Sequence, residues 1–283
     1  MEVVGIRRAG NPAEAAVRDA DGNVTVLGTI EQFWGHARRW LHAVPGGPPI
    51  AESDVDLVPP VLPDARVICV GLNYREHVAE GSYRDAPVAE FPTLFARWPS
   101  SLTVSSAAIP VPADEAGLDW EGEIVAWVGE TLVDADPEQA LAAVVGYSVF
   151  NDVTARRAQK LTSQWTLGKN ADRSGPLGPL VPADAVGDLR AGLRLETRVN
   201  GQLVQQGSTD EMIYDVGTTL SLISRTLTLR PGDLLATGTP SGVGYSRRPP
   251  WLLQPGDTVE VRAEKLGAIT NPIVSNEARF PVR

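Results

Sequence analysis

The sequence predicts a mainly β fold with some α-helix, in the α+β class. The 27 glycines and 23 prolines among 283 residues imply many turns, which suits a β-rich chain. Short apolar runs typical of buried strands lie at 66–71, 124–128 and 147–153. Nearer the C-terminus, one turn signal precedes a strand-like segment twice, as Pro231-Gly232-Asp233 and as Pro255-Gly256-Asp257.

The chain is predicted to divide into a small N-terminal β/α unit over 1–62 and a catalytic domain over 63–283. Segments 3–8 and 23–27 are typical of two strands around the turn Asp21-Gly22, and a short helix is expected over 30–44. Proline and glycine pairs at 46–49 and 59–60 then mark a linker.

Two further helices are predicted in the main body. Asp136-Pro137 is a helix start with an Asp cap, and Gly146 is expected to end that helix. The capping-box pattern at 208–211 precedes apolar residues at three/four spacing, which predicts an amphipathic helix running to about residue 227. The polar, small-residue segment 81–91 is expected to be a loop.

Composition limits the function classes. The net charge of −10 and a pI near 4.9 argue against nucleic acid, whose binding depends on basic patches. A small anionic substrate remains compatible if a metal and a few basic residues create a local positive site. Cys69 is the single cysteine, so no internal disulfide forms, and a reducing cytoplasmic location is expected. No apolar run approaches the length of a membrane span, so no membrane partner is expected.

Asp119, Glu121 and Glu123 alternate and lead into an apolar run that is typical of a strand. Residues two apart share one face of a strand, so these like charges repel unless a partner neutralises them. Hard divalent cations choose carboxylate oxygens and would serve that purpose. The alternative is a solvated strand face, since acidic residues are mostly exposed.

His77 and Glu80 are three apart in a segment that leaves a strand and enters a turn or helix. On a helix they would be neighbours. A carboxylate beside an imidazole fixes the tautomer of the ring and raises its basicity, which a general base needs. An ordinary surface pair is the alternative.

Four more positions follow a buried-looking strand. Asp152 lies where that strand ends, as a further metal carboxylate or as the cap of the next helix. Arg156 and Gln159 are three apart and are expected to face one substrate together. Lys169 lies in a loop rich in Gly and Pro, where its ammonium can reach an oxyanion or a carboxylate, or simply be solvated.

Five blocks together resemble the fumarylacetoacetate hydrolase family: Gly-Leu-Asn-Tyr-x-x-His-x-x-Glu at 71–80, Asp-x-Glu-x-Glu at 119–123, Asn-Asp-Val-Thr-Ala-Arg-x-x-Gln at 151–159, Gly-Lys-x-x-Asp at 168–172 and Gly-Thr-Pro-Ser-Gly-Val-Gly at 238–244. They occur in the family's order and cover roughly residues 65 to 275. The similarity is to the acylpyruvate hydrolase, oxaloacetate decarboxylase and hydroxymuconate isomerase-like members.

The resemblance implies a rolled mixed β-sheet with a few helices and a homodimer. It implies Mg²⁺ or Mn²⁺ bound by Glu121, Glu123 and Asp152, with Asp119 less certain as a ligand. It also implies a water-activating dyad, His77 and Glu80, in a segment that orders when substrate binds. Substrate contacts are expected from a further set of residues: Tyr74, Arg156, Gln159, Lys169 and Thr239.

The chain departs from the family pattern at three places. Arg157 stands where many members have Asp, Arg173 follows Asp172 where many have Thr, and the segment 95–99 contains Arg97-Trp98 instead of the Lys that often precedes a proline there. By motif position these changes lie near the pocket, and they bear on substrate identity more than on metal binding.

The leading functional hypothesis is metal-dependent hydrolysis of a C–C bond in a 1,3-dicarbonyl acid of the acylpyruvate type. His77, oriented by Glu80, would activate water, and Lys169 with Gln159 would stabilise the oxyanion. The first alternative is decarboxylation, isomerisation or tautomerisation of a 2-oxo acid through the same enolate. The second is a non-catalytic protein that keeps the fold and the metal.

Overall fold

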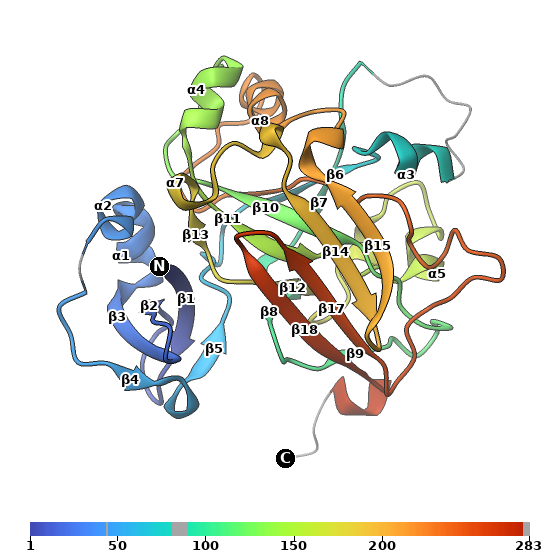
Figure 1. The fold of residues 1–283 in the computed structure, drawn as a ribbon, viewed down its shortest axis with the longest axis horizontal. Coiled ribbons are helices and arrows are strands. Elements are labelled where there is room, and N and C mark those ends of the chain that lie inside the picture. The colour runs from blue at the N-terminus through green and yellow to red at the C-terminus, as the bar shows by residue number, and fades with distance from the viewer. Residues whose placement is uncertain (44, 81–89, 280–283) are drawn as a thin grey trace.

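A computed structural model describes residues 1–43, 45–80 and 90–279, arranged as three β-sheets with short helices (Figure 1). Most of the predicted loop at 81–91 lies outside the described residues. The mainly β prediction with some helix is confirmed. Among the described residues, no helix is long and apolar enough to span a bilayer.

The first sheet belongs to the N-terminal segment. Its strand order is β4-β3-β2-β1-β5 and its neighbouring strands are antiparallel. The strands are β1 (Glu2–Arg7), β2 (Glu14–Arg18), β3 (Asn23–Thr29), β4 (Ile50–Ala51) and β5 (Asp56–Val58). The sequence prediction missed β2, whose alanines have low strand propensity. The turn Asp21-Gly22 joins β2 to β3, whereas it was predicted to join segments 3–8 and 23–27.

The single helix predicted over 30–44 is wrong in one respect, because it is two helices. They are α1 (Ile30–Gly35), which Thr29 caps through a capping box, and α2 (Ala37–Leu41). Gly35 has low helix propensity, and His36 leaves the helical conformation at φ −147°. Trp34 of α1 stacks on Trp127 of the main body with ring centroids 5.2 Å apart, so the two segments share one hydrophobic core.

The central sheet has eight strands in the order β7-β6-β16-β10-β11-β12-β8, with β13 paired to β11. Its strands are β6 (Val67–Gly71), β7 (Thr93–Arg97), β8 (Leu102–Val104), β10 (Gly122–Val128), β11 (Val144–Asn151), β12 (Gly175–Leu177), β13 (Val181–Pro182) and β16 (Leu234–Ala236). Every residue of β10 and β11 is buried, because both faces of the sheet are covered. Side chains of β10 therefore alternate between two cores, with Ile124 in one and Val125 in the other.

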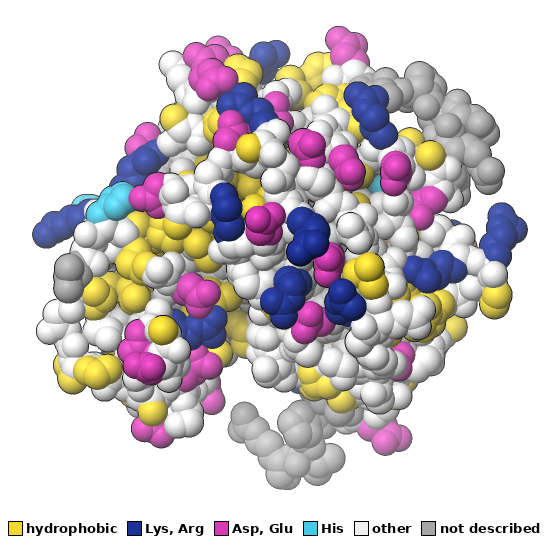
Figure 2. All heavy atoms as spheres, in the orientation of Figure 1, with side chains coloured by type: hydrophobic (Ala, Val, Ile, Leu, Met, Phe, Trp, Pro, Cys, Tyr) yellow, Lys and Arg dark blue, Asp and Glu magenta, His cyan; other side chains and the backbone are white. Residues whose placement is uncertain are grey.

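The third sheet, in the order β15-β14-β17-β18-β9, covers one face of the central sheet. Its strands are β9 (Ile109–Pro110), β14 (Arg194–Val199), β15 (Gln202–Ser208), β17 (Thr258–Ala263) and β18 (Gly267–Val274). Figure 2 shows basic and acidic side chains interspersed on the face above these strands. Ion pairs such as Arg198–Glu196 at 3.2 Å and Arg262–Glu260 at 3.4 Å lie there, as on an ordinary solvated surface.

The remaining helices are α3 (Arg75–Glu80), α4 (Pro137–Ala142), α5 (Arg156–Gln159), α6 (Thr166–Lys169), α7 (Ala183–Val186) and α8 (Val216–Ser224). Asp136 caps α4 as predicted, but Gly146 does not end that helix, because it lies inside β11. A Cβ at Gly146 would lie 2.6 Å from the carbonyl oxygen of Val181, so the close approach of β13 requires glycine.

The helix predicted after residue 211 begins later than expected. The capping box at Ser208 closes only the single 3₁₀ turn η4 (Thr209–Glu211), after which Met212 is extended. Asp215 is the true cap of α8, because its side chain accepts a hydrogen bond from the Thr218 backbone at 2.8 Å.

Candidate metal centre and active site

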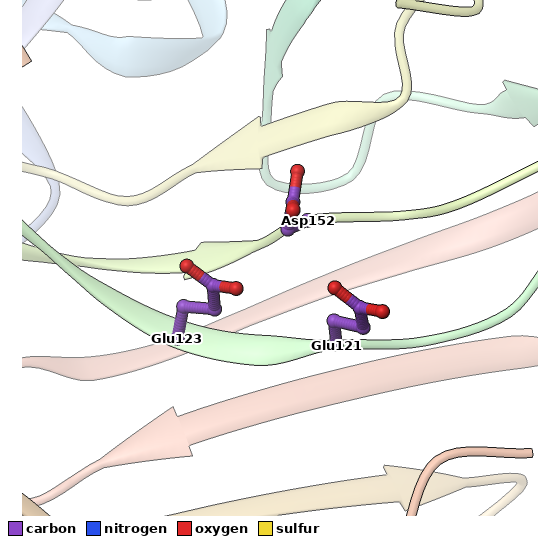
Figure 3. Close-up of side chains that lie close together, drawn as sticks. All are labelled: Glu121, Glu123 and Asp152. Atoms are coloured by element: carbon purple, nitrogen blue, oxygen red, sulfur yellow. The ribbon is translucent and has the colours of Figure 1, made fainter. Parts of the chain in front are cut away.

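The three predicted metal carboxylates meet where two antiparallel strands begin and end. Gly122 at the start of β10 pairs with Asn151 at the end of β11, and the Asp152 backbone donates to the Glu121 carbonyl oxygen at 2.8 Å. This register places Asp152 beside Glu121 and Glu123, and one ligand oxygen from each lies within 4.8 Å of the others. Figure 3 shows all three carboxylates pointing to the same side of the sheet. All are buried, which excludes the solvated strand face as the alternative.

Lys169 at the end of α6 neutralises part of this cluster. Its ammonium lies 2.5 Å from both Glu121 Oε2 and Asp152 Oδ2, and it is 1% exposed. Burial lowers the pKa of Lys169, but the charges of Asp152 and Glu121 outweigh burial and raise it. Against the same opposing effect of burial, Lys169 and Arg156 lower the pKa of Glu121 to about 2. This lysine is therefore held as a cation.

Two buried arginines complete the charge balance. Arg156 Nη2 lies 2.7 Å from Asp119 and 2.6 Å from Glu121, while its Nη1 donates to the Gln159 side chain at 3.0 Å. Arg97 forms an ion pair with Asp152 and donates to the Val153 carbonyl oxygen at 2.7 Å. Asp152 therefore forms ion pairs with two cations and does not cap the helix that follows. The N-cap of that helix is Ala155, which makes no side-chain hydrogen bond.

Glu123 is the carboxylate without a cation. It accepts a backbone hydrogen bond from Gly238 at 3.0 Å, and among the described residues no Lys or Arg forms an ion pair with it. Burial, followed by the charges of Asp152 and Glu121, raises its pKa well above the ordinary value. Four buried carboxylates face three cations, so the cluster with every carboxylate ionised would carry one uncompensated negative charge. Three buried carboxylates with such a deficit suit a hard divalent cation such as Mg²⁺ or Mn²⁺.

His77 and Glu80 form the predicted pair on the short helix α3. His77 Nδ1 lies 2.8 Å from Glu80 Oε1. Burial raises the pKa of Glu80, but hydrogen bonds from His77, Gly242 and Ser246 outweigh this and hold it below the ordinary value. An ionised carboxylate only accepts, so Nδ1 carries the proton and Nε2 remains available as a base.

The glycine-rich segment after β16 anchors this helix. The Gly242 backbone donates to Glu80 Oε2 at 2.9 Å, the Ser246 hydroxyl donates to the same oxygen at 3.1 Å, and Ser241 donates to Glu76 at 3.2 Å. The loop that carries the predicted substrate contact Thr239 therefore also fixes the orientation of the histidine, through Glu80.

Replacing Ser246 with alanine should shift the acid limb of the kcat profile to higher pH, by up to about one unit. The reason is that one hydrogen bond to ionised Glu80 is lost, so its pKa rises and His77 loses its orienting partner earlier on acidification. The measurement is kcat against pH for the wild type, Ser246→Ala and the exposed control Ser53→Ala. An unchanged limb would mean that Glu80 does not set it.

A cavity of about 680 Å³ joins the carboxylate cluster to the histidine pair. It is lined by most of the predicted site residues: His77, Glu80, Glu121, Glu123, Arg156, Gln159, Lys169 and Thr239. Asp152 lies behind this lining, completely buried. Thr239 also donates to the Gly122 carbonyl oxygen at 2.9 Å and so ties the glycine-rich loop to the metal strand.

Tyr74 is the predicted substrate residue that the structure does not bring to the cavity. Its side chain is 1% exposed, and its hydroxyl has no hydrogen-bond partner in the described part of the chain. Burial, followed by the charge of Glu123, raises its pKa, so the phenol stays neutral. A direct substrate contact would therefore require Tyr74 to leave its buried position.

Other residues on the cavity wall were missed by the sequence analysis: Lys160, Trp165, Tyr245, Ser246, Arg247 and Arg248. The basic pair Arg247-Arg248 is separated by two residues from the end of the Gly-Thr-Pro-Ser-Gly-Val-Gly block, which was the available signal. Of the three departures from the family pattern, Arg97 reaches the cluster through Asp152, whereas Arg157 is exposed, pairs with Asp114 at 3.8 Å and does not line the cavity. Arg173 does not line it either.

The mainly β fold brings the buried carboxylates and the His–Glu pair into one cavity, and comparison of the sequence with known protein families agrees with this arrangement. The family profile described as "Fumarylacetoacetate (FAA) hydrolase C-terminal" matches residues 66–274. The chain therefore belongs to the fumarylacetoacetate hydrolase family, as its motifs predicted.

Individual relatives include enzymes of different reaction classes. The chain is 38% identical over 228 residues to the mitochondrial oxaloacetate tautomerase fahd2 of Xenopus laevis, covering 80% of this chain and 70% of the relative. The structure of a fumarylacetoacetate hydrolase from psychrophilic Exiguobacterium antarcticum superimposes with a TM-score of 0.79 at 36% identity, covering 97% of this chain and 100% of that one. A Pseudomonas aeruginosa fumarylpyruvate hydrolase in complex with Mn²⁺ and pyruvate gives a TM-score of 0.68 at 32% identity, covering 78% of this chain and 92% of that one.

Proposed function

We propose that this protein catalyses the divalent-metal-dependent keto–enol tautomerisation of a 2-oxo acid of the oxaloacetate type. The observation that carries the proposal is the oriented His77–Glu80 pair in the same cavity as the carboxylate cluster. Proton transfer between carbon and oxygen needs one positioned base and a way to stabilise negative charge. The relative from Xenopus laevis named as an oxaloacetate tautomerase supports the choice of substrate type.

Each residue has a part in such a reaction. His77 Nε2 would take a proton from the carbon next to the ketone, and the electron pair of the broken C–H bond would move onto the ketone oxygen. The oxygen would take a proton from solvent, and the His77 imidazolium would return its proton to solvent. Glu80 would hold the imidazole and stabilise its protonated form. Mg²⁺ or Mn²⁺ held by Glu121, Glu123 and Asp152 would supply a Lewis acid for the developing charge. Gln159, at the end of α5, would offer its amide to the substrate.

Lys169 is the reason for placing tautomerisation ahead of C–C hydrolysis. Hydrolysis needs a donor for the oxyanion that forms when water attacks a carbonyl. The Lys169 ammonium is already bound to Glu121 and Asp152, each at 2.5 Å, so it is poorly placed to serve as that donor. Tautomerisation makes no tetrahedral oxyanion and therefore does not need such a donor.

Hydrolysis of an acylpyruvate remains the second candidate. The fumarylpyruvate hydrolase that resembles this chain supports it, since its complex contains pyruvate and Mn²⁺. The same His77–Glu80 pair could activate a water molecule in place of a carbon acid. Decarboxylation of a 2-oxo acid and a non-catalytic role are the further alternatives that the experiment has to separate.

The test is the ultraviolet absorbance of the enol form of oxaloacetate, mixed with purified protein and Mg²⁺ or Mn²⁺, and repeated with EDTA. Tautomerisation predicts faster metal-dependent loss of the enol with no pyruvate formed. Pyruvate without uptake of oxygen from ¹⁸O-labelled water would indicate decarboxylation. Pyruvate and a labelled carboxylic acid from an acylpyruvate would indicate hydrolysis. No metal-dependent change with either acid would overturn the proposal.

A further inference from the structure

Asp119 lies just before β10 but is not one of the three carboxylates that meet in the candidate metal cluster. Its side chain is completely buried. The Trp120 and Gly244 backbones donate to its Oδ1 at 2.9 and 2.7 Å. The Tyr245 backbone and Arg156 Nε donate to its Oδ2 at 3.1 and 2.7 Å. A carboxylate offers about four lone-pair sites, so these donors occupy all of them and leave none for a metal ion.

Two of these donors belong to residues 242–246, which we call the anchor loop. The anchor loop also donates to Glu80 Oε2, from the Gly242 backbone at 2.9 Å and from the Ser246 hydroxyl at 3.1 Å. The loop therefore connects Asp119 with the carboxylate that orients the predicted base.

Trp120 adds a second hydrogen bond between the start of the metal strand and the anchor loop. Its indole Nε1 donates to the Gly242 carbonyl oxygen at 3.2 Å, so Gly242 is held at its carbonyl while its N–H donates to Glu80. Trp120 is completely buried, so packing fixes its ring. A Cβ at Gly244 would lie 2.8 Å from Asp119 Oδ1, so the close approach of the loop to this carboxylate requires glycine.

Asp119 is connected to the metal cluster as well. Arg156 donates to both Asp119 and Glu121, with its Nη2 2.6 Å from Glu121 Oε1. Neither Asp119 nor Trp120 lines the cavity, so neither is placed to contact a substrate. Both residues lie between the metal carboxylates and the anchor loop.

We infer that Asp119 and Trp120 are positioning residues, which fix the anchor loop against the metal strand so that Glu80 sets the tautomer and the direction of the His77 imidazole. The inference rests on the proposed function for the part that His77 plays in the reaction. The arrangement explains why an acid that binds no metal precedes the two metal carboxylates of the strand. It fixes the base relative to the metal through groups that contact neither substrate nor ion.

The experiment measures the tautomer of His77 by ¹⁵N NMR in the whole chain with Mg²⁺, at about pH 9, where histidine side chains are ordinarily neutral. The chain has three histidines, so His77→Gln assigns the signal, and the exposed His36 and His42 are internal references. In the wild type, Glu80 should hold the proton on Nδ1. In Asp119→Asn the ratio of the Nδ1–H to the Nε2–H tautomer should fall about 2–10-fold, equivalent to one hydrogen bond.

Asparagine has the shape of aspartate but only one acceptor oxygen, so two of the four donors would face an NH₂ group. Trp120→Phe removes the indole N–H alone and should shift the tautomer ratio in the same direction by less, so it carries the test if Asp119→Asn does not fold. Asp114→Asn is the matched control, because Asp114 is an exposed acid of the same segment, and it should keep the wild-type ratio.

A wild-type ratio in Asp119→Asn and in Trp120→Phe would overturn the inference. Asp119→Asn should still gain thermal stability from saturating Mn²⁺, and loss of that gain would make Asp119 a ligand and overturn the inference too.

With the enol as substrate, Asp119→Asn should lower kcat about 10–100-fold, as expected for a residue that orients a catalytic group. It should have no further effect in the His77→Gln background, because a residue that acts through His77 has nothing left to position. A further loss there would contradict the inference. The tautomer measurement needs no turnover, so the expected shift in a protein that converts no enol would contradict the proposed function alone.

Discussion

Replacing His77 with glutamine is expected to lower kcat for tautomerisation by about 10²–10⁴-fold, the usual contribution of general acid–base catalysis. The reason is that His77, whose Nδ1 is held by Glu80 at 2.8 Å, is the one histidine among the described residues that line the cavity. Glutamine keeps a polar side chain of similar reach but cannot exchange a proton near neutral pH. The measurement is the initial rate of enol loss at saturating Mg²⁺, with KM determined in parallel.

Two further variants make this result specific. His36→Gln removes an exposed histidine of the N-terminal segment and should leave kcat unchanged. Glu80→Gln should lower kcat less than His77→Gln does, because the imidazole keeps a hydrogen-bond partner but loses the charge that stabilises its protonated form. If His77→Gln retained more than about a tenth of the wild-type kcat, His77 would not be the base.

Local patterns predicted the inner part of the site well. The alternation of Asp119, Glu121 and Glu123 placed three acids on one side of a strand, and the three/four spacing on a helix brought His77 to Glu80. Both relations depend only on the geometry of a single element, which the sequence encodes directly. The arrival of Asp152 beside Glu121 and Glu123 depends on the β10–β11 register. Its place at a strand end left a metal carboxylate and a helix cap open as alternatives, and the family resemblance pointed to the metal carboxylate.

Tertiary contacts decided what the local patterns could not. Arg97 meets Asp152 across 55 positions, and Lys160 meets Tyr245 across a longer separation still, so no short-range spacing reveals either contact. Gly146 was interpreted as the end of a helix, whereas the close approach of β13 accounts for it. Tyr74 lies within a matching motif, yet packing buries it away from the cavity. Lys160, Arg247 and Arg248 of the cavity wall were missed for the same reason, since two segments distant in the sequence carry them.

Replacing Glu123 with glutamine is expected to abolish metal-dependent activity without destabilising the metal-free protein. Glu123 is the buried carboxylate left without a cation. Its negative charge therefore destabilises the metal-free fold, whereas its carboxylate serves as a ligand when the metal is bound. Its pKa in the folded protein is raised, so the stability that its protonated form contributes is lost as pH rises through that pKa. Glutamine mimics the protonated form, and the stability advantage of the variant should therefore grow as pH increases above the ordinary range of glutamate.

Thermal unfolding with and without Mn²⁺ separates the two roles. At a concentration of one hundred times Kd, the ion should stabilise the wild type by about 2.7 kcal/mol, which raises Tm by several degrees. Glu123→Gln should show little of this response, and EDTA should remove it from the wild type. Glu264→Gln, at an exposed position beyond β17, should respond as the wild type does. A full Mn²⁺ response in Glu123→Gln would remove Glu123 from the ligand set, and a metal-free variant less stable than the wild type would show that Glu123 stabilises the fold by itself.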